Sequence, residues 1–222
     1  MTALFVTGTG TGVGKTWITA RLIREARAAG MPVEALKPVI SGFDPHDAAE
    51  SDSGHLLAAL GRPIDERTLA TISPWRFAAP LSPDMAAARE GRAVDFDALV
   101  ELCRRRIAEA EGLLLIEGVG GAMVPLDGGH TVRDWIAALG IPAVVVAGSY
   151  LGTISHSLTT LDSLAVAGIE AKALVISESE SNPVPLAETA AALARFTAVP
   201  ILTAGRDEEA DSGSSLLKGL LR

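Results

Sequence analysis

The sequence predicts an α/β fold, a three-layer sandwich in which helices cover both faces of a mostly parallel central sheet. Short, uninterrupted apolar runs alternate along the chain with longer segments whose apolar residues recur at helical spacing. An uninterrupted apolar run is typical of a strand that is buried on both faces, and such strands belong to parallel sheets. A glycine-rich segment follows the first apolar run directly. Ligands of parallel sheets bind beyond the carboxyl ends of the strands, so we expect the functional site at that edge.

The individual elements follow from the same patterns. Strands are expected at 4–6, 33–36, 113–116, 143–147, 173–176 and 199–202. Helices are expected from about 17 to before Gly30, at 56–60, at 95–111, at 153–166, and in a segment that runs through 193. Residues 131–134 have the spacing of a capping box, which predicts a helix start there. The stretch 63–91 is rich in Pro and Ala and stays unassigned, and the acidic tail 207–213 is expected to be loosely ordered.

Composition bounds the class of protein. A length of 222 residues suits a single domain spanning 1–222. The net charge of −8 argues against broad nucleic-acid binding, which needs a basic face. No run approaches the ~18 apolar residues of a membrane helix, and the N-terminus lacks signal-peptide features, so we expect a cytoplasmic protein. Cys103 is the single cysteine and is expected to be a small buried residue. The four histidines lack metal-ligand spacing, which argues against structural zinc.

The segment 8–16, Gly-Thr-Gly-Thr-Gly-Val-Gly-Lys-Thr, lies between a predicted strand and a predicted helix. This is the context of a phosphate-binding P-loop, in which glycines let the backbone approach phosphate oxygens and the helix N-terminus attracts the anion. Lys15 can reach the β- and γ-phosphates, and the Thr16 hydroxyl can ligate Mg²⁺. The strict spacing fails by one residue, because Thr9 stands where the first glycine is usual. The alternative is a mere strand–helix turn, but Gly-Lys-Thr at the expected helix start favours a P-loop NTPase-like fold.

Three further residues could carry chemistry, and each has an ordinary alternative. Glu117 ends a buried strand and could anchor a Mg²⁺–nucleotide, or it could be a strand-end carboxylate in solvent. Lys37 ends the second strand before a proline, and it is either a functional cation or a solvated charge. Asp52 could be a ligand or a helix-start carboxylate that interacts with the dipole. Spacing alone does not separate Asp52 from Asp47 or Glu50.

Taken together, three motifs resemble the ATP-dependent dethiobiotin synthetases of the P-loop NTPase superfamily. The resemblance covers about residues 3–180, and the family itself carries the extra residue in its P-loop. The segments 80–83, Pro-Leu-Ser-Pro, and 151–156, Leu-Gly-Thr-Ile-Ser-His, resemble a Pro-x-Ser-Pro turn and a helix start of the same family. The three motifs are Gly8-Thr9-x-Thr11-x-Val13-Gly14-Lys15-Thr16, Lys37-Pro38-Val39-x-Ser41-Gly42 and Glu117-Gly118-x-Gly120-Gly121.

The resemblance implies a ligase reaction that closes the ureido ring of dethiobiotin in biotin biosynthesis. One amine of 7,8-diaminopelargonic acid takes up CO₂ as a carbamate, the carbamate oxygen attacks the γ-phosphate of ATP, and the second amine displaces phosphate. Carbamate and triphosphate are both anions, so bringing them together requires cations and N–H donors in a partly dry site. Holding the second amine close to the activated carbon makes ring closure fast.

The resemblance also implies roles for individual residues. Lys15, Lys37 and Thr11 would be catalytic, with Lys37 facing the carbamate. Thr16, Asp52 and Glu117 would hold Mg²⁺. Nucleotide would be bound by Gly12, Val13, Gly14, Lys15, Thr16, Trp17, Asp52, Glu117, Gly118, Val119, Gly120, Ser177 and Glu178. The substrate would be bound by Ser41 and Pro80 and, across the interface of a homodimer, by Gly152, Thr153 and Ile154 at a helix N-terminus.

The chain departs from the family pattern near the nucleotide base. Ser177-Glu178 stands where the family has an Asn-Asp pair that recognises adenine, and a serine hydroxyl offers less than an amide. Other nucleoside triphosphates are therefore expected to serve. Ser155 replaces an Asn near the substrate tail, and the late Gly-x-Ile-Pro segment is replaced by residues 203–206, Thr-Ala-Gly-Arg.

Two other functions stay open. A P-loop switch or partitioning ATPase would usually carry a second lysine early in the loop, and residues 9–13 contain none. An amide ligase of the cobyrinic acid diamide synthase kind would usually carry an additional glutamine-hydrolysing domain, for which 222 residues leave no room.

Overall fold

The computed structural model describes residues 2–180, 182–206 and 215–221. Within them, six strands form one sheet in the order β2–β5–β1–β6–β7–β8, and every neighbouring pair is parallel. The inner strands β1, β5, β6 and β7 are buried over most of their length, as expected for a sheet that is covered on both faces, whereas the edge strands β2 and β8 are partly exposed. The fold class predicted from the sequence is thus confirmed. The strands are β1 (Thr2–Gly8), β2 (Val33–Leu36), β5 (Leu113–Glu117), β6 (Ala143–Gly148), β7 (Ala171–Ser177) and β8 (Ile201–Ala204).

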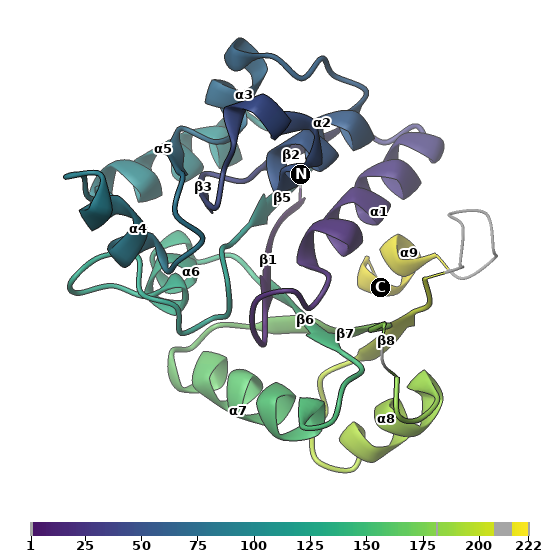
Figure 1. Cartoon of the computed structure of the whole chain (residues 1–222). Helices are drawn as coiled ribbons and strands as arrows, with labels where there is room; N and C mark the ends of the chain where they lie inside the picture. The colour runs from purple at the N-terminus through teal and green to yellow at the C-terminus, as the bar shows by residue number, and fades with distance from the viewer. Residues whose placement is uncertain (1, 181, 207–214, 222) are drawn as a thin grey trace.

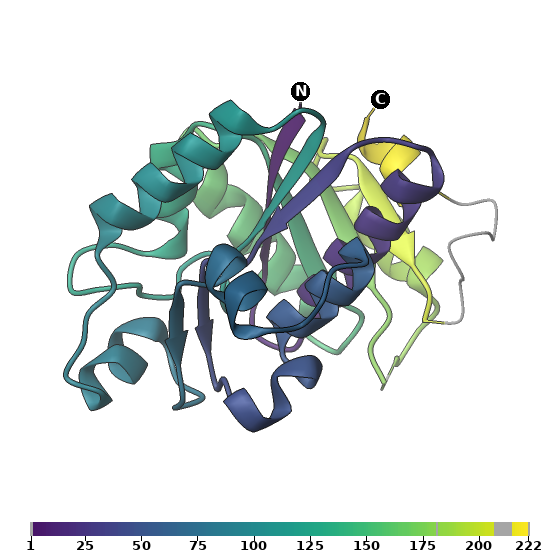
Figure 2. The ribbon, with the colours of Figure 1, turned by 90° about the horizontal axis from the view of Figure 1, so that it is seen from above.

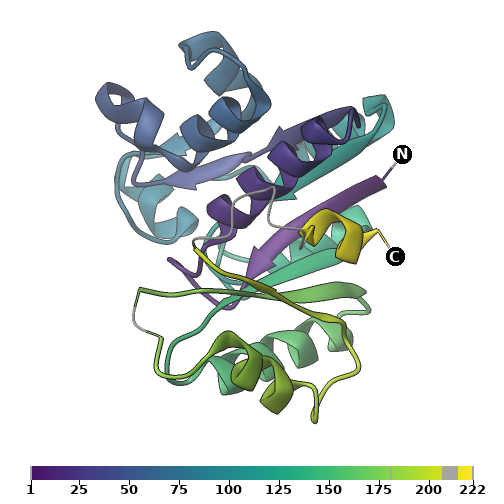
Figure 3. The ribbon, with the colours of Figure 1, turned by 90° about the vertical axis from the view of Figure 1, so that its right-hand side faces the viewer.

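Helices lie on both sides of this sheet (Figure 1). On one side are α1 (Lys15–Ala28), α2 (Asp52–Leu60) and α9 (Leu216–Leu220). On the other side are α5 (Phe96–Glu109), α6 (Val132–Leu139), α7 (Thr153–Val166) and α8 (Leu186–Leu193). Figure 3 shows α1 and α7 on opposite sides of the strands. The division follows from right-handed crossovers, because the β1-to-β2 connection runs opposite to the later ones along the sheet.

The chain between β2 and α5 builds a second, smaller layer that the sequence did not predict. It contains β3 (Val39–Ser41), the 3₁₀ helix η1 (Pro45–Glu50), α3 (Glu66–Ile72), β4 (Trp75–Phe77) and α4 (Pro83–Arg89). In this part of the chain β3 and β4 form a two-stranded parallel sheet. Figure 2 shows this pair at the side of the molecule away from both chain ends. Strands of three residues are too short to show a period in sequence, so the pairing depends on tertiary contacts.

Local signals placed most element ends within two residues, although α2 begins at Asp52, four residues before the predicted segment 56–60. The predicted capping box is present, with the Asp134 N–H bonded to the Thr131 hydroxyl and the Thr131 N–H to the Asp134 carboxylate. The helix at 153–166 has the predicted bounds. The last strand begins two residues later than predicted, at Ile201 rather than at Val199. Pro200 explains the shift, because it has no N–H and joins β7 only through its carbonyl, which accepts from Leu174.

The interior is closed by aromatic and apolar contacts and, beside α9, by the buried Glu25 carboxylate. Trp135 meets Phe5 edge to face, with the ring centroids 4.8 Å apart. Cys103 is buried as predicted, and desolvation raises the pKa of its thiol to about 12. Glu25 of α1 accepts hydrogen bonds from the Ser215 hydroxyl and the Leu217 N–H, which fixes the start of α9 on α1. The predicted loose tail at 207–213 lies outside the described residues.

Candidate functional site

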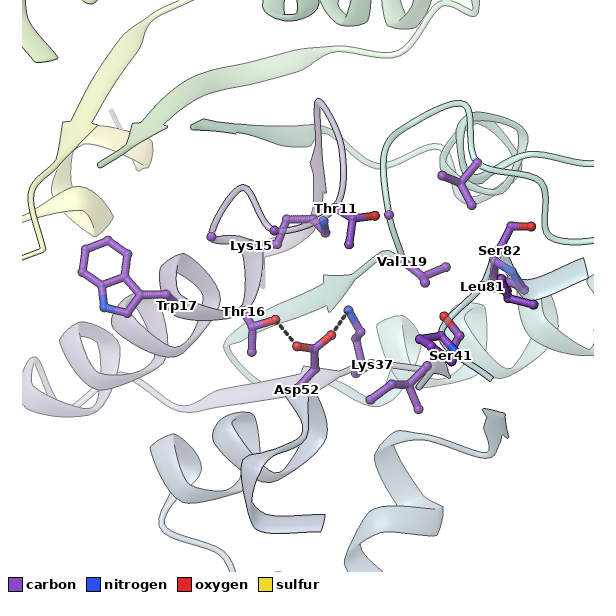
Figure 4. A pocket seen from close by; sticks show the side chains of 17 residues that line it. Thr11, Lys15, Thr16, Trp17, Lys37, Ser41, Asp52, Leu81, Ser82 and Val119 are labelled. Atoms are coloured by element: carbon purple, nitrogen blue, oxygen red, sulfur yellow. Dashed lines mark hydrogen bonds and ion pairs between the residues drawn. The ribbon is translucent and has the colours of Figure 1, made fainter. Parts of the chain in front are cut away.

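The site lies at the carboxyl ends of three adjacent strands, β2, β5 and β1. The P-loop connects β1 to α1, Lys37 follows β2, and Glu117 ends β5. Side chains from these segments surround one pocket of about 720 Å³ (Figure 4). Its lining residues are Thr11, Gly12, Gly14, Lys15, Thr16, Trp17, Lys37, Ile40, Ser41, Asp52, Pro80, Leu81, Ser82, Pro83, Val119, Gly120 and Val124.

Gly14 and Lys15 define the P-loop geometry. Gly14 caps α1 in the left-handed region, with φ +93°, and a Cβ there would lie 2.5 Å from the Ser177 hydroxyl oxygen. Both facts restrict this position to glycine. Lys15 begins α1, and its buried ammonium donates to the Gly10 carbonyl at 2.8 Å. Burial, together with the nearby charge of Lys37, lowers the pKa of Lys15 to about 8.

A charge cluster forms the floor of the pocket, in which Lys37 and Glu117 are buried and the Asp52 side chain is 43% exposed. The Lys37 ammonium lies 2.7 Å from Glu117 Oε1 and 2.9 Å from Asp52 Oδ2, and it donates to the Gly118 carbonyl at 2.8 Å. The Thr16 hydroxyl lies 2.8 Å from Asp52 Oδ1 and 2.7 Å from Glu117 Oε1. Figure 4 shows Asp52 between Thr16 and Lys37. Glu117 is 0% and Lys37 1% exposed, so neither is the solvated strand-end charge that the sequence left open.

Two members of the cluster, Lys37 and Asp52, have pKa values shifted in favour of their charged forms. Desolvation works against the Lys37 ammonium, but the Glu117 and Asp52 carboxylates outweigh it and raise the pKa of Lys37. Desolvation likewise works against the Asp52 carboxylate, but Lys37 and the Thr16 hydroxyl lower the pKa of Asp52. Lys37 is therefore a cation and Asp52 an anion at neutral pH.

The structure resolves the choice among the acidic residues near position 50. Asp47 and Glu50 belong to the 3₁₀ helix η1 and are exposed. Asp52 is the first residue of α2, and the Ser51 side chain caps that helix by accepting from the Gly54 N–H. Asp52 is thus a helix-start carboxylate and also a member of the charge cluster. Asp52 can therefore begin a helix and also contribute its carboxylate to the site.

The remaining pocket residues come from the P-loop, the smaller layer and the loop after β5. Thr11 is exposed on the P-loop, and Ser41 ends β3. Pro80 lines the pocket as predicted, and Gly118 contributes the carbonyl that holds Lys37. Sequence reasoning missed the wall formed by Ile40, Leu81, Ser82, Pro83 and Val124, of which only the Pro-x-Ser-Pro turn gave a signal.

A second pocket of about 710 Å³ continues from the first and shares Gly12, Gly14 and Trp17 with it. Val13, Ser177 and Glu178, for which the sequence analysis predicts nucleotide binding, are among its lining residues. The Arg206 N–H donates to the Glu178 carboxylate at 2.9 Å, and the Arg206 guanidinium donates to the Glu178 carbonyl at 3.2 Å. Sequence reasoning missed the other lining residues, Tyr150, Ser179, Glu180 and Arg206.

The predicted tail-binding residues Gly152, Thr153 and Ile154 line neither of these two pockets. Gly152 caps α7 with φ +101°, and the Thr153 hydroxyl donates to the Gly148 carbonyl at 2.5 Å. Leu151 is 91% exposed beside them. The Thr153 N–H already donates to the Tyr150 carbonyl at 3.1 Å, and Ile154 lies outside both pockets of its own chain.

Two kinds of feature, a membrane-spanning helix and a metal-binding group of side chains, are absent among the described residues. No helix among them is long and apolar enough to cross a membrane. No group of three or more His, Cys, Asp or Glu side chains in this part of the chain is arranged to hold a metal ion by itself. An ion at the charge cluster would therefore need the Thr16 hydroxyl besides the two carboxylates.

Comparison with known proteins gives both family and fold. A family model described as an AAA domain matches residues 2–206. The ATP-dependent dethiobiotin synthetase of Acidiphilium cryptum (strain JF-5) is 54% identical over 196 residues, 88% of this chain and 88% of that protein. The enzyme of the same name from Methylobacterium nodulans (strain LMG 21967 / CNCM I-2342 / ORS 2060) is 48% identical over 212 residues, 93% of this chain and 94% of that protein.

Solved structures extend the likeness at lower identity. The signal recognition particle receptor FtsY from Elizabethkingia anophelis has a TM-score of 0.55 and 12% identity, and the match covers 100% of this chain and 65% of that chain. Chloroplast FtsY from Physcomitrella patens has a TM-score of 0.52 and 14% identity, with the same coverage. This chain thus spans just under two thirds of their length, and at this identity the likeness shows the fold alone.

The charge cluster predicts a measurable coupling between Lys37 and Glu117. Lys37→Met leaves Glu117 buried beside an apolar side chain, so we expect the free energy of unfolding to fall by about 3–5 kcal/mol. Adding Glu117→Gln removes the uncompensated charge and should recover at least about 1 kcal/mol of that loss. Urea unfolding of the two single variants and the double variant measures the coupling. Strictly additive losses would show that the ion pair does not hold this floor together.

Proposed function

This chain belongs to the family of ATP-dependent dethiobiotin synthetases, and we propose that the two pockets together carry out ring closure on 7,8-diaminopelargonic acid. The chain is an ATP-dependent ligase that forms a C–N bond. One observation supports the assignment of this chemistry to the site. A P-loop lysine and a second buried lysine, Lys15 and Lys37, line one pocket together with the hydroxyls of Thr11 and Ser41. Such a set suits two anions side by side rather than a triphosphate alone.

The phosphate end of ATP binds on the P-loop. Backbone N–H groups at the start of α1 point toward this end of the pocket, and the helix dipole favours negative charge there. Lys15 exchanges its bond with the Gly10 carbonyl for the β- and γ-phosphate oxygens. The nucleoside then extends from Gly12 and Gly14 into the second pocket, toward Ser177 and Glu178.

The carbamate forms and reacts on the Lys37 side. Lys37, held as an ammonium by Glu117 and Asp52, already uses its three N–H donors on Glu117, Asp52 and the Gly118 carbonyl. It would exchange at least one of these bonds to donate to the carbamate and to the phosphoryl group in transfer. A carbamate oxygen bonds to the γ-phosphorus, and the bond from that phosphorus to ADP breaks. The second amine then attacks the carbonyl carbon, the C–O bond to phosphate breaks, and the amine gives up a proton. Thr11, Ser41 and Pro80 position the diamine for this closure.

The residues of the charge cluster also fit Mg²⁺. Glu117 Oε2 is buried and has no hydrogen-bond partner among the described residues. The Thr16 hydroxyl has one proton but faces two carboxylate oxygens, at 2.7 and 2.8 Å. Hydroxyl and carboxylate oxygens are the hard ligands that Mg²⁺ prefers. Thr16, Asp52 and Glu117 would hold the ion, which neutralises charge on the phosphate oxygens when bound.

The substrate's carboxylate tail needs a second site, and we place it at the start of α7 of a partner subunit. Gly152 and Ile154 offer backbone N–H groups at a helix N-terminus, outside the pocket of their own chain. Thr153 would exchange its N–H bond with the Tyr150 carbonyl for the substrate carboxylate. The exposed Leu151 and Ile154 supply apolar surface for the methylene chain and the interface. The active unit is then a homodimer of chains that each form one domain over 1–222, working in the cytoplasm where ATP is supplied.

The reaction itself is the first test. Dethiobiotin should form only when nucleoside triphosphate, Mg²⁺, bicarbonate and the diamine are all present, measured by mass spectrometry of the product. Lys37→Ala should lower kcat by about 10³-fold with a smaller change in nucleotide affinity, because Lys37 acts on charge that develops in transfer. Nucleotide hydrolysis that ignores the diamine would sink the proposal and favour a P-loop switch.

A pH dependence of ATP binding follows from Lys15. Its pKa is about 8 in the free protein, and bound triphosphate favours the ammonium and raises that pKa. Above pH 8, therefore, binding must take up a proton, and the Kd for ATP should rise by about tenfold per pH unit. Calorimetry in two buffers of different ionisation heat measures both quantities. Lys15→Arg stays charged and should show a flat profile, whereas a flat wild-type profile would contradict the assignment.

The dimer proposal predicts complementation between two inactive variants. Lys37→Ala removes the catalytic lysine, and Ile154→Pro removes one N–H in the first turn of α7, where proline is tolerated. A mixed dimer of the two has one site with both wild-type parts. Co-expression should restore about a quarter of wild-type activity, since half of the dimers are mixed and each has one intact site. Ile154→Ala controls for the side chain, and no recovery would place the tail site within one chain.

A further inference from the structure

Trp17 lies where the P-loop pocket continues into the second pocket. It directly follows Thr16 in the first turn of α1 and lines both pockets. Figure 4 shows its indole on the opposite side of Thr16 from Lys37, away from the transfer chemistry. A triphosphate whose γ end is near Lys37 therefore has its nucleoside end on the Trp17 side.

The Trp17 indole is supported by the side chain of Arg21 on the same helix. The Arg21 guanidinium lies over its ring at 5.8 Å from the centroid, and Arg21 is itself buried and ion-paired to Glu25 at 3.0 Å. Glu25 is fixed in turn by the Ser215 hydroxyl and the Leu217 N–H. A half-buried indole supported in this way is a rigid flat surface that loses little freedom when a ligand stacks on it.

The polar side chains that line the second pocket are mostly engaged within the protein. The Tyr150 hydroxyl lies 2.8 Å from His156 Nδ1, and the Ser179 hydroxyl accepts from the Ser149 N–H at 3.0 Å. Ser177 offers one hydroxyl, which rotates to accept from an amino group or to donate to a carbonyl. It cannot move deeper, because it lies against Gly14. The Glu178 carboxylate is already bonded to the Arg206 N–H, and the Arg206 guanidinium is bonded to the Glu178 carbonyl. Glu180 lies 3.6 Å from that guanidinium.

We propose that this chain holds its nucleotide by stacking the base on Trp17 and not by recognising the base edge, so that it takes ATP, GTP, CTP and UTP with little discrimination. Every base has a π-face, so a stacking surface tolerates all four. The inference rests on the proposed function for the direction in which the nucleotide lies. Trp17 is then the residue that sets the breadth of nucleotide use, while the P-loop supplies the phosphate contacts.

Direct binding tests the proposal independently of turnover. The Kd values of ATP, GTP, CTP and UTP with Mg²⁺, measured by calorimetry on the full chain, should agree within about tenfold. A preference of about a hundredfold or more for any one base would overturn the proposal, because it would require hydrogen-bond recognition of an edge. If binding is broad but no nucleotide supports dethiobiotin formation, the proposed function fails and this inference stands.

Substitution of Trp17 separates stacking from a structural role. Trp17→Ala should raise the Kd and KM of all four nucleotides by about tenfold, a larger change than that in kcat, and Trp17→Phe should restore most of the affinity. Inhibition by inorganic tripolyphosphate, which has no base, should be the same in Trp17→Ala and in the wild type. Phe196→Ala removes an aromatic side chain that lines neither pocket and serves as the matched control. Weaker tripolyphosphate inhibition in Trp17→Ala, or unchanged nucleotide affinity, would overturn the proposal.

Discussion

The ion pairs of Lys37 with Glu117 and Asp52 are the interaction on which the rest of the site depends. An ammonium that is 1% exposed can stay charged only when carboxylates compensate for the lost water. The three partners come from the ends of β2 and β5 and from the start of α2, so their meeting requires both strands in register and α2 docked on them. The Gly118 carbonyl adds a third contact to the ammonium. The same geometry that satisfies a buried charge therefore builds the floor of the pocket.

This floor is coupled to the phosphate end of the site. The Thr16 hydroxyl contacts both carboxylates, and the charge of Lys37 contributes to the low pKa of Lys15. Two cations thus lie near each other, each beside groups that a triphosphate and a carbamate would replace or share. The two ammonium groups repel each other and together attract anions. In the free protein, the Glu117 and Asp52 carboxylates offset this repulsion. The contacts of Lys37 and Thr16 with the two carboxylates therefore stabilise the fold and would also affect the binding of substrates.

In the proposed function, the two ends of the nucleotide meet different surroundings. The phosphate end meets a backbone that is restricted at Gly14 by a positive φ and by the close Ser177 side chain. The base end meets a flat indole, one hydroxyl and a Glu178–Arg206 pair whose hydrogen bonds are mostly satisfied within the protein. Such a site would hold the phosphates rigidly for phosphoryl transfer, while the base would add to binding affinity without being recognised by its edge.

Local sequence determined the parallel sheet, the P-loop and most helix ends of this protein. Three signals involve only residues close together in the sequence: the uninterrupted apolar runs, the Gly-Lys-Thr helix start and the 131–134 capping box. They can therefore be recognised without knowledge of tertiary contacts. The position of Glu117 at the end of a strand could be predicted from the sequence for the same reason. Tertiary structure alone decided that Asp52 and not Asp47 or Glu50 meets Lys37, because the choice depends on where η1 ends and α2 docks. It also decided the β3–β4 pair and the place of Arg206 beside Glu178, since three-residue strands and contacts across 28 positions leave no local pattern.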